Sequence, residues 1–302
     1  MNKNFVKYRN YYLIFSSLLI LASLIIIPVF GLKLGIDFTG GTLWQIRPTN
    51  NVQLDSNAIK NFFSDELGVK NLTVYPESDS NSFSIKLSHI SEEEHGQYFS
   101  ALKNKFGEIE EMQYQTIGPS IGQELKQKAL WAIVLVLLGI SLYVAFAFRK
   151  VSYPVKSWKY GVITLIALFH DVIIPIGFYV CLSKIIGIDV NINFVVAVLV
   201  IVGFSVHDTI VVFDRIRENL LLNRVKLDMP AIVNQSLNQT MARSINTSLT
   251  LIIVLLTMFF FGPAILKYFI LTILVGTIVG TYSSIFIASS LLLLILPKEF
   301  RK

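Results

Sequence analysis

The chain has 302 residues, of which 53% are hydrophobic and only 15% are charged. Soluble globular domains carry about 25% charged residues, so this deficit indicates a membrane protein. The net charge of +6 is spread over short clusters between apolar runs rather than over one basic stripe, which argues against nucleic-acid binding. The single cysteine, Cys181, excludes an internal disulfide framework and is expected to be a small buried apolar residue.

The first apolar stretch covers residues 11–30 and follows three basic residues. A secretory signal peptide has the same order of charges, but its apolar region is only about 7–15 residues and ends in small residues at a cleavage site. This stretch is long enough to cross about 30 Å of hydrocarbon. Its last residues, Pro28-Val29-Phe30, offer no cleavage site. We therefore predict a retained membrane helix within residues 1–30.

Residues 31–128 have the composition of a soluble domain. Strand-like alternation marks residues 43–47, 72–75, 83–87 and 109–117, and helical spacing marks residues 55–67 and the segment after Ser91. Ser91 is suited to an N-cap because three glutamates follow it in the first turn. The resulting order β-α-β-β-α-β predicts a ferredoxin-like α+β domain.

Five further apolar runs follow this domain, at residues 129–148, 160–182, 192–213, 244–262 and 268–296. Together with the first helix they predict a bundle of six transmembrane helices, of which five lie within residues 129–302. The predicted fold class is thus an α-helical membrane bundle with one external ferredoxin-like domain.

The short loops carry an orientation signal. Three basic residues lie at the N-terminus, four at residues 149–159, five at residues 214–243 and three in the C-terminal tail, whereas the opposite short loops hold only Lys184 and Lys267. Because positively charged loops stay cytoplasmic, we expect both termini inside the cell and residues 31–128 outside.

The segment 214–243 is predicted to be an amphipathic cytoplasmic loop. Asp228 and Pro230 are suited to start a short helix in it, with apolar side chains on one side at positions 232, 233, 237 and 241. This helix either lies on the bilayer or covers the ends of other helices, or else it forms a docking surface for a cytoplasmic partner.

Polar side chains follow one face of three membrane helices. Thr164 and Asp171 share a face of the third predicted helix, and Ser205 and Asp208 share a face of the fourth. The fifth carries a polar strip made of Arg243, Asn246, Thr247, Thr250 and Thr257. Since lipid cannot satisfy such groups, we expect the strips to turn inward and to bring Asp171, Asp208 and Arg243 near one another.

A carboxylate within a membrane helix is costly and is by default a functional residue. A low-dielectric surrounding favours the neutral form of a carboxyl group, whereas a neighbouring guanidinium, which stays protonated, favours the ionised form. Asp208 beside Arg243 could therefore exchange a proton, and a static ion pair is the alternative that the residues alone leave open. Asp171 favours a proton relay, because one arginine cannot neutralise two carboxylates.

The remaining polar residues indicate no other chemistry. His170 and His207 each precede an aspartate, but neighbouring helix positions point about 100° apart, so packing or hydrogen bonding is expected of both. The sequence has no metal-ligand spacing, nucleophilic triad, Walker loop or dinucleotide fingerprint. We therefore expect no enzyme, cofactor, metal site or bound ATP. Gly276 and Gly280 form a small-xxx-small pattern typical of close helix packing.

Several motifs in this order resemble the SecD/SecF family of bacterial protein-export subunits, and its SecF half most closely. They are GIDFTGGT at residues 35–42, IGPSIG at 117–122, His170-Asp171-Val172, DTIVVFDRIREN at 208–219 and RSINTS at 243–248. In this resemblance Asp208 matches the proton-carrying aspartate, Arg243 its partner arginine and Asp171 a further family aspartate. His207 departs from the Asn or other small polar residue that is usual before the proton carrier.

The resemblance implies a SecF-like subunit, related to the RND superfamily of proton-driven pumps, that uses the proton gradient to promote preprotein export across the inner membrane. The implied partners are a SecD-like subunit, the SecYEG translocon and the unfolded preprotein, within the lipid bilayer. Two alternatives remain. The chain could be a passive assembly subunit of the translocase, or half of an RND exporter of small molecules or lipids, whose external loops are much larger than residues 31–128.

Overall fold

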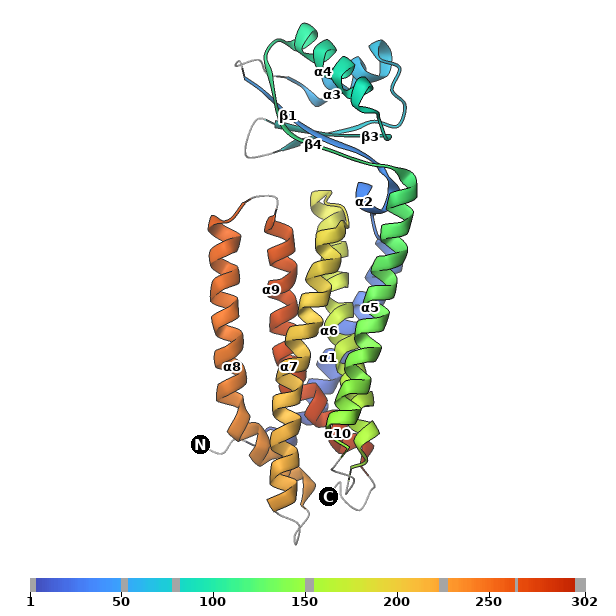
Figure 1. Cartoon of the computed structure of the whole chain (residues 1–302). Helices are drawn as coiled ribbons and strands as arrows, with labels where there is room; N and C mark the ends of the chain where they lie inside the picture. Colours follow the sequence, from blue (N-terminus) through green and yellow to red (C-terminus); the bar gives the residue numbers. More distant parts are fainter. Residues whose placement is uncertain are drawn as a thin grey trace. The chain divides into compact units, whose positions relative to one another are not determined.

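The computed structural model describes residues 4–49, 54–77, 82–149, 155–222, 228–263 and 266–296. The chain forms two compact units, shown in Figure 1. The small unit is Leu34–Leu130, and the helical unit combines Met1–Lys33 with Trp131–Lys302. The small unit corresponds to the domain predicted at residues 31–128.

The small unit is a four-stranded sheet with helices. The strands are β1 (Gly41–Pro48), β2 (Thr73–Glu77), β3 (Ser82–Leu87) and β4 (Ile109–Ile117), and the helices are α2 (Ile36–Thr39), α3 (Ser56–Asn61) and α4 (Glu92–Phe106). The strand order is β2-β3-β1-β4, with antiparallel neighbours throughout. This is the arrangement of a split β-α-β unit, so the predicted ferredoxin-like order is confirmed.

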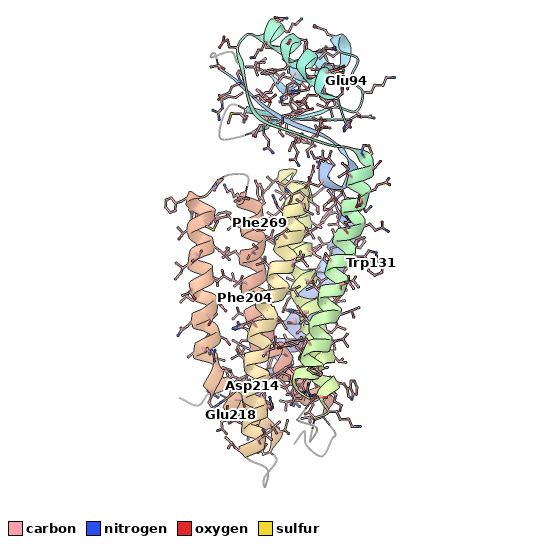
Figure 2. The ribbon with its side chains drawn as sticks, viewed as in Figure 1. Glu94, Trp131, Phe204, Asp214, Glu218 and Phe269 are labelled. Atoms are coloured by element: carbon pink, nitrogen blue, oxygen red, sulfur yellow. The ribbon has the colours of Figure 1, made fainter. Side chains whose placement is uncertain are left out.

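The core of the small unit forms around Trp44 on β1, which is fully buried and donates from Nε1 to Glu111 at 2.8 Å. Helix α3 continues into a π-helical turn, Phe62–Glu66, whose wider winding lets Phe62 and Phe63 both face the core. Helix α4 starts with a capping box, in which Ser91 and Glu94 each satisfy a backbone N–H of the other. Figure 2 shows Glu94 on this helix.

Two glycines allow α2 and the start of α5 to meet closely within the small unit. Gly40 has a φ of 73°, and a Cβ added there would lie 2.6 Å from Cα of Pro119. A Cβ on Gly122 would lie 2.7 Å from the backbone nitrogen of Gly40. The motifs around residues 40 and 122 are therefore the two sides of one backbone contact that leaves no room for side chains.

The helical unit contains the membrane-spanning segments. Six helical segments are long and apolar enough to cross a bilayer: Val6–Phe30, Pro119–Ala147, Ser157–Ile186, Ile192–Leu222, Met229–Phe261 and Lys267–Ile295. They contain α1 (Arg9–Phe30), α5 (Pro119–Ala147), α6 (Ser157–Ile186), α7 (Ile192–Leu222), α8 (Met229–Phe261), and α9 (Lys267–Tyr282) with α10 (Ala288–Ile295). The prediction of six transmembrane helices is confirmed. Trp131 on α5 is 59% exposed and points away from the other helices (Figure 2).

Helices α1 and α6 pack along each other, and two of their contacts are spaced seven residues apart on each helix. Ser16 Oγ lies 2.8 Å from His170 Nε2. One heptad further, a Cβ on Gly177 would lie 2.6 Å from Cβ of Ser23, so α1 approaches α6 where the latter lacks a side chain. Small residues at such contacts are typical of membrane helices, where van der Waals packing replaces the hydrophobic effect.

Helices α7 and α9 meet along the predicted small-residue stripe. A Cβ on Gly276 would lie 2.3 Å from Ile201, and a Cβ on Gly280 would lie 3.0 Å from Cβ of Ser205. One turn further along both helices, Thr209 and Ser284 are hydrogen-bonded at 2.9 Å between their hydroxyls. The glycines thus bring α9 so close to α7 that the turn following α9 bonds to α7.

The predicted loop at residues 214–243 is wrong in its extent. Helix α7 continues to Leu222, and α8 begins at Met229 with Asp228 as its N-cap, while residues 223–227 lie outside the described residues. Figure 2 places Asp214 and Glu218 on the C-terminal part of α7. Hydropathy indicates where a chain leaves the membrane, whereas the helix itself can continue beyond that point. The apolar side of this segment covers helix ends, as one of the predicted alternatives has it, since Val233 and Leu237 pack in one buried cluster with Ile216.

Candidate functional site

Asp208 lies on α7 with only 1% of its surface exposed. Ser248 on α8 donates to its Oδ2 over a long distance of 3.4 Å. The Nδ1 atom of His207 lies 3.7 Å from its Oδ1, and the His207 side chain is 60% exposed. Within the described ranges, no lysine or arginine forms an ion pair with Asp208. This buried carboxylate therefore has few fixed partners.

Ser248 connects three helices through one hydroxyl group. Its Oγ lies 2.8 Å from the Ser244 carbonyl on α8 and 2.6 Å from Thr281 Oγ1 on α9, in addition to Asp208 on α7. A hydroxyl has one proton to donate, so it cannot serve the carbonyl and the carboxylate together. The direction in which Ser248 donates can therefore follow the charge of Asp208.

Arg243 differs from its prediction. It is exposed, and it interacts with Asp208 through space without a direct ion pair among the residues that the structure describes. Asn246, Thr250 and Thr257 are exposed as well, so the strip on α8 does not turn inward within this chain. The adjacent side of α8, which carries the buried Ser244 and Ser248, packs toward α7 and α9 instead. Sequence reasoning placed the wrong side of α8 inside because the strip has the more polar side chains.

Asp171 on α6 is fully buried, and it has more hydrogen-bond partners than Asp208. Its Oδ1 lies 2.7 Å from His170 Nδ1, and its Oδ2 accepts from Ser283 at 2.7 Å and from Ser205. Ser205 lies one turn before Asp208 on α7, so the same helix serves both carboxylates. Asp171 and Asp208 are thus linked through α7, but they have separate hydrogen-bond partners.

Both histidines turn toward the aspartate that follows them, although their helix positions point in different directions: Nδ1 lies 2.7 Å from Asp171 in His170 and 3.7 Å from Asp208 in His207. An imidazole Nδ1 and a carboxylate oxygen each lie two bonds from Cβ, so the two side chains bend together. His170 is buried, and its two ring nitrogens lie at hydrogen-bonding distance from Asp171 and Ser16, which agrees with the predicted bonding role. His207 has the same sequence context but an exposed ring.

Sequence reasoning missed two serine partners of the carboxylates, Ser248 at Asp208 and Ser283 at Asp171. A π-helical turn, Ser283–Ile287, joins α9 to α10 and turns two consecutive serines into the bundle. Ser283 bonds to Asp171, and Ser284 bonds to Thr209 and to the Ser205 carbonyl. Such turns are frequent at functional sites, but their wider winding leaves no periodic signal in a sequence. A pair of adjacent polar residues, Ser283-Ser284, in an apolar run is the one available signal.

Comparison with known proteins supports the family. The family model "Protein export membrane protein SecD/SecF, C-terminal" matches residues 97–298, and the "SecD/SecF GG Motif" model matches residues 25–52. The SecF protein translocase subunit of Thermobaculum terrenum is 41% identical, over 98% of this chain and 94% of that protein. The SecF subunit of Helicobacter pylori strain J99 is 35% identical, over 97% of this chain and 87% of that protein.

A solved structure shows the same fold. The crystal structure of SecDF from Thermus thermophilus, described as a translocon-associated membrane protein, has a TM-score of 0.81 and 35% sequence identity with this chain. The match covers 96% of this chain but only 38% of the SecDF chain. The residues matched by the GG motif model include Gly40, whose missing side chain leaves room for Pro119, and Gly41, where a Cβ would lie 2.9 Å from the Leu87 carbonyl oxygen. This chain therefore belongs to the SecD/SecF family of protein-export membrane proteins.

Proposed function

We propose that this chain is a SecF-type subunit that uses proton movement through Asp208 to promote preprotein export across the bacterial inner membrane. The family membership supports the export role. The observation that carries the proton role is the partner set of Asp208, which is a buried carboxylate with one long hydrogen bond and an exposed histidine beside it. A carboxylate that its surroundings do not lock into one charge state is suited to gain and lose a proton.

Arg243 is the electrostatic switch in this proposal. Its guanidinium stays protonated, so it moves no proton itself, but it attracts Asp208 only when that carboxylate is ionised. The two charge states of Asp208 therefore favour different distances between α7 and α8. A ligand or proton can bias a conformational equilibrium only through such a differential interaction.

We propose that a SecD-like subunit covers the exposed strip of α8. Arg243 and Asn246 are exposed polar side chains within a membrane-spanning helix, and lipid cannot satisfy them. The SecDF relative is a longer chain than this protein, since the match covers only 38% of its length. A SecD-like partner would supply the surface that this chain lacks.

Asp171 is the second carboxylate of the proposed relay. Three donors already surround it, and one of them is the buried imidazole of His170. We propose that Asp171 passes protons together with His170, because the imidazole Nδ1 lies 2.7 Å from the carboxylate and Ser205 connects Asp171 to the helix that carries Asp208.

We propose that His207 connects Asp208 to water. Its ring is 60% exposed and lies 3.7 Å from the carboxylate. An imidazole has one ring nitrogen that can accept a proton and one that can release a proton, so an exposed ring can pass protons between water and the carboxylate. A small amide at this position could not pass protons. The departure of His207 from the family pattern therefore affects the proposed proton route.

The topology follows from the basic clusters, which we propose to be cytoplasmic together with both termini. The small unit is then periplasmic, where it can meet the emerging preprotein. The SecYEG translocon is the proposed channel partner, and the proton gradient is the proposed energy source in place of ATP or another cofactor.

The test is preprotein export in a strain that depends on this chain. Asp208→Asn is expected to lower proton-dependent export at least about tenfold, because the amide cannot titrate, while Asp208→Glu retains part of it. Asp214→Asn is the matched control, since it makes the same change at an exposed position of the same helix. Normal export by Asp208→Asn in a normally assembled complex contradicts the relay. Full activity of the charge swap Asp208→Arg with Arg243→Asp would favour a static pair in a passive subunit.

A further inference from the structure

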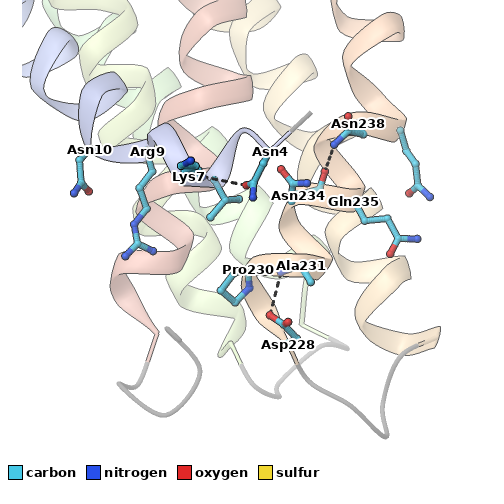
Figure 3. A pocket seen from close by; sticks show the side chains of 12 residues that line it. Asn4, Lys7, Arg9, Asn10, Asp228, Pro230, Ala231, Asn234, Gln235 and Asn238 are labelled. Atoms are coloured by element: carbon cyan, nitrogen blue, oxygen red, sulfur yellow. Dashed lines mark hydrogen bonds between the residues drawn. The ribbon is translucent and has the colours of Figure 1, made fainter. Parts of the chain in front are cut away.

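A wide groove of about 1030 Å³ lies between the N-terminal segment and the start of α8. Figure 3 shows Lys7 and Arg9 on one side of it and Pro230, Ala231 and Asn234 on the other. The two parts are held together by the backbone N–H of Phe5, which donates to Asn234 Oδ1 at 2.8 Å. This hydrogen bond joins the two sides of the groove.

The lining of the groove favours an anion. Lys7 and Arg9 form no ion pair within the described part of the chain. The one acidic residue, Asp228, already accepts from the Ala231 backbone at 3.1 Å as the N-cap of α8. The other polar side chains are carboxamides, which can donate to phosphate and hydroxyl oxygens: Asn4, Asn10, Asn234, Gln235, Asn238 and Gln239.

Aromatic side chains place the groove at the level of the lipid headgroups. Tyr8 and Tyr11 are 49% and 71% exposed, and they begin the membrane-spanning segment Val6–Phe30 beside the groove. Trp158, at the start of α6, is 56% exposed at the same end of the helical unit. Tyrosine and tryptophan gather where the hydrocarbon meets the headgroups, so this end of the bundle lies in that layer.

We propose that this groove binds the headgroup of an anionic phospholipid. Its phosphate lies between Lys7 and Arg9, and its polar alcohol bonds to the carboxamides of α8. The acyl chains follow α1, where Ile14, Phe15 and Leu18 are exposed beyond the groove. The occupant is a lipid because the bilayer surrounds this layer, and basic pockets between membrane helices bind such headgroups. This inference is independent of the proton relay.

The test is native mass spectrometry of the full chain in detergent, with phosphatidylglycerol and with phosphatidylcholine as probes. The double variant Lys7→Gln, Arg9→Gln is expected to bind phosphatidylglycerol about 10- to 30-fold more weakly, since each basic group near the surface contributes a several-fold attraction. Arg149→Gln with Lys156→Gln removes the same charge from exposed positions outside the groove and is expected to change binding less than about threefold.

Two further arms identify the ligand and guard against a folding defect. Lys7→Gln alone, at an exposed position, is expected to lose about fivefold, and Lys7→Arg is expected to restore binding. Equal losses in the groove and control pairs would overturn the proposal, as would equal binding of both lipids. Complete competition by millimolar inorganic phosphate would assign the groove to a free anion and overturn the lipid.

Discussion

Ser248 on α8 donates a hydrogen bond to Asp208 on α7, with 3.4 Å between Oγ and Oδ2, while the same Oγ lies 2.8 Å from the Ser244 carbonyl. The hydroxyl proton can turn to the carboxylate when Asp208 is ionised and return to the carbonyl when Asp208 is protonated. This bond joins the two helices that carry the proposed proton carrier and its arginine. The charge of Asp208 is thereby linked to the packing of α8.

Ser248→Ala is expected to make proton release from Asp208 about fivefold less favourable, because a weak hydrogen bond to the ionised form contributes about 1 kcal/mol. The measurement is the pH dependence of export in the complemented strain. Ser244→Ala is the matched control, since its Oγ is buried one turn away and has no hydrogen-bond partner among the described residues. Indistinguishable pH profiles for both variants would show that Ser248 does not act on Asp208.

His207→Asn is expected to lower proton-dependent export, because an amide beside Asp208 cannot accept and release a proton as an exposed imidazole can. Export rates of the parent and of the variant in the complemented strain measure this loss. His95→Asn, in the small unit, is the control for loss of a histidine elsewhere. Unchanged export by His207→Asn would exclude His207 as the proton route.

Gly40→Ala is expected to destabilise the small unit by about 1–3 kcal/mol more than Gly107→Ala. Both glycines have a positive φ, 73° and 86°, but only Gly40 has backbone within reach of a Cβ. The difference therefore reports the close approach of Pro119 and not the backbone conformation. Fluorescence of the buried Trp44, with Trp131 and Trp158 replaced by Phe, follows unfolding of this unit. Equal losses would mean that the contact relaxes without cost.

The membrane helices and the sheet order were predictable from the sequence because each rests on a local pattern. A run of apolar residues is needed wherever a helix crosses lipid, as in Ile192–Leu222. Ser91 and the glutamates after it predict the start of α4, and Ser91 forms a capping box with Glu94 in the structure. Gly276 and Gly280 indicated close packing, and Ile201 and Ser205 fill the space they leave.

The rest of the site was not predictable because it depends on how each helix is rotated about its own axis and on local changes in helical winding. Arg243 and Ser248 lie on neighbouring sides of α8, and only tertiary packing decides that Ser248 faces Asp208. The π-helical turn at Ser283 shifts the register of every later side chain of the last helix. The first turns of α8 were not predicted as part of the long helix, because polar residues around Asn234 lower the hydropathy of a segment that remains helical.

Glu94 is expected to make the stability of the small unit depend on pH. The backbone N–H and the hydroxyl of Ser91 donate to Glu94, and these hydrogen bonds hold the pKa of Glu94 below its usual value of 4.5. A depressed folded pKa means that the stabilisation is complete above the unfolded pKa and is lost as pH falls through the folded pKa.

Glu94→Gln keeps an acceptor at this position and cannot titrate. The difference in thermal unfolding between the parent and Glu94→Gln is therefore expected to shrink as pH falls from about 6 to about 3. Trp44 fluorescence measures it, and Glu93→Gln controls for loss of a charge in the first turn. A difference that is constant across this range would contradict the assignment.

The most direct measurement is proton flux through the complex of this chain with its SecD-like partner, reconstituted in vesicles that contain a pH-sensitive dye. An imposed pH gradient is expected to drive flux in the parent and in Asp214→Asn, and at least about tenfold less flux in Asp208→Asn, because the carrier is then absent. Full flux through a correctly assembled Asp208→Asn complex would contradict the proposal that Asp208 carries the proton.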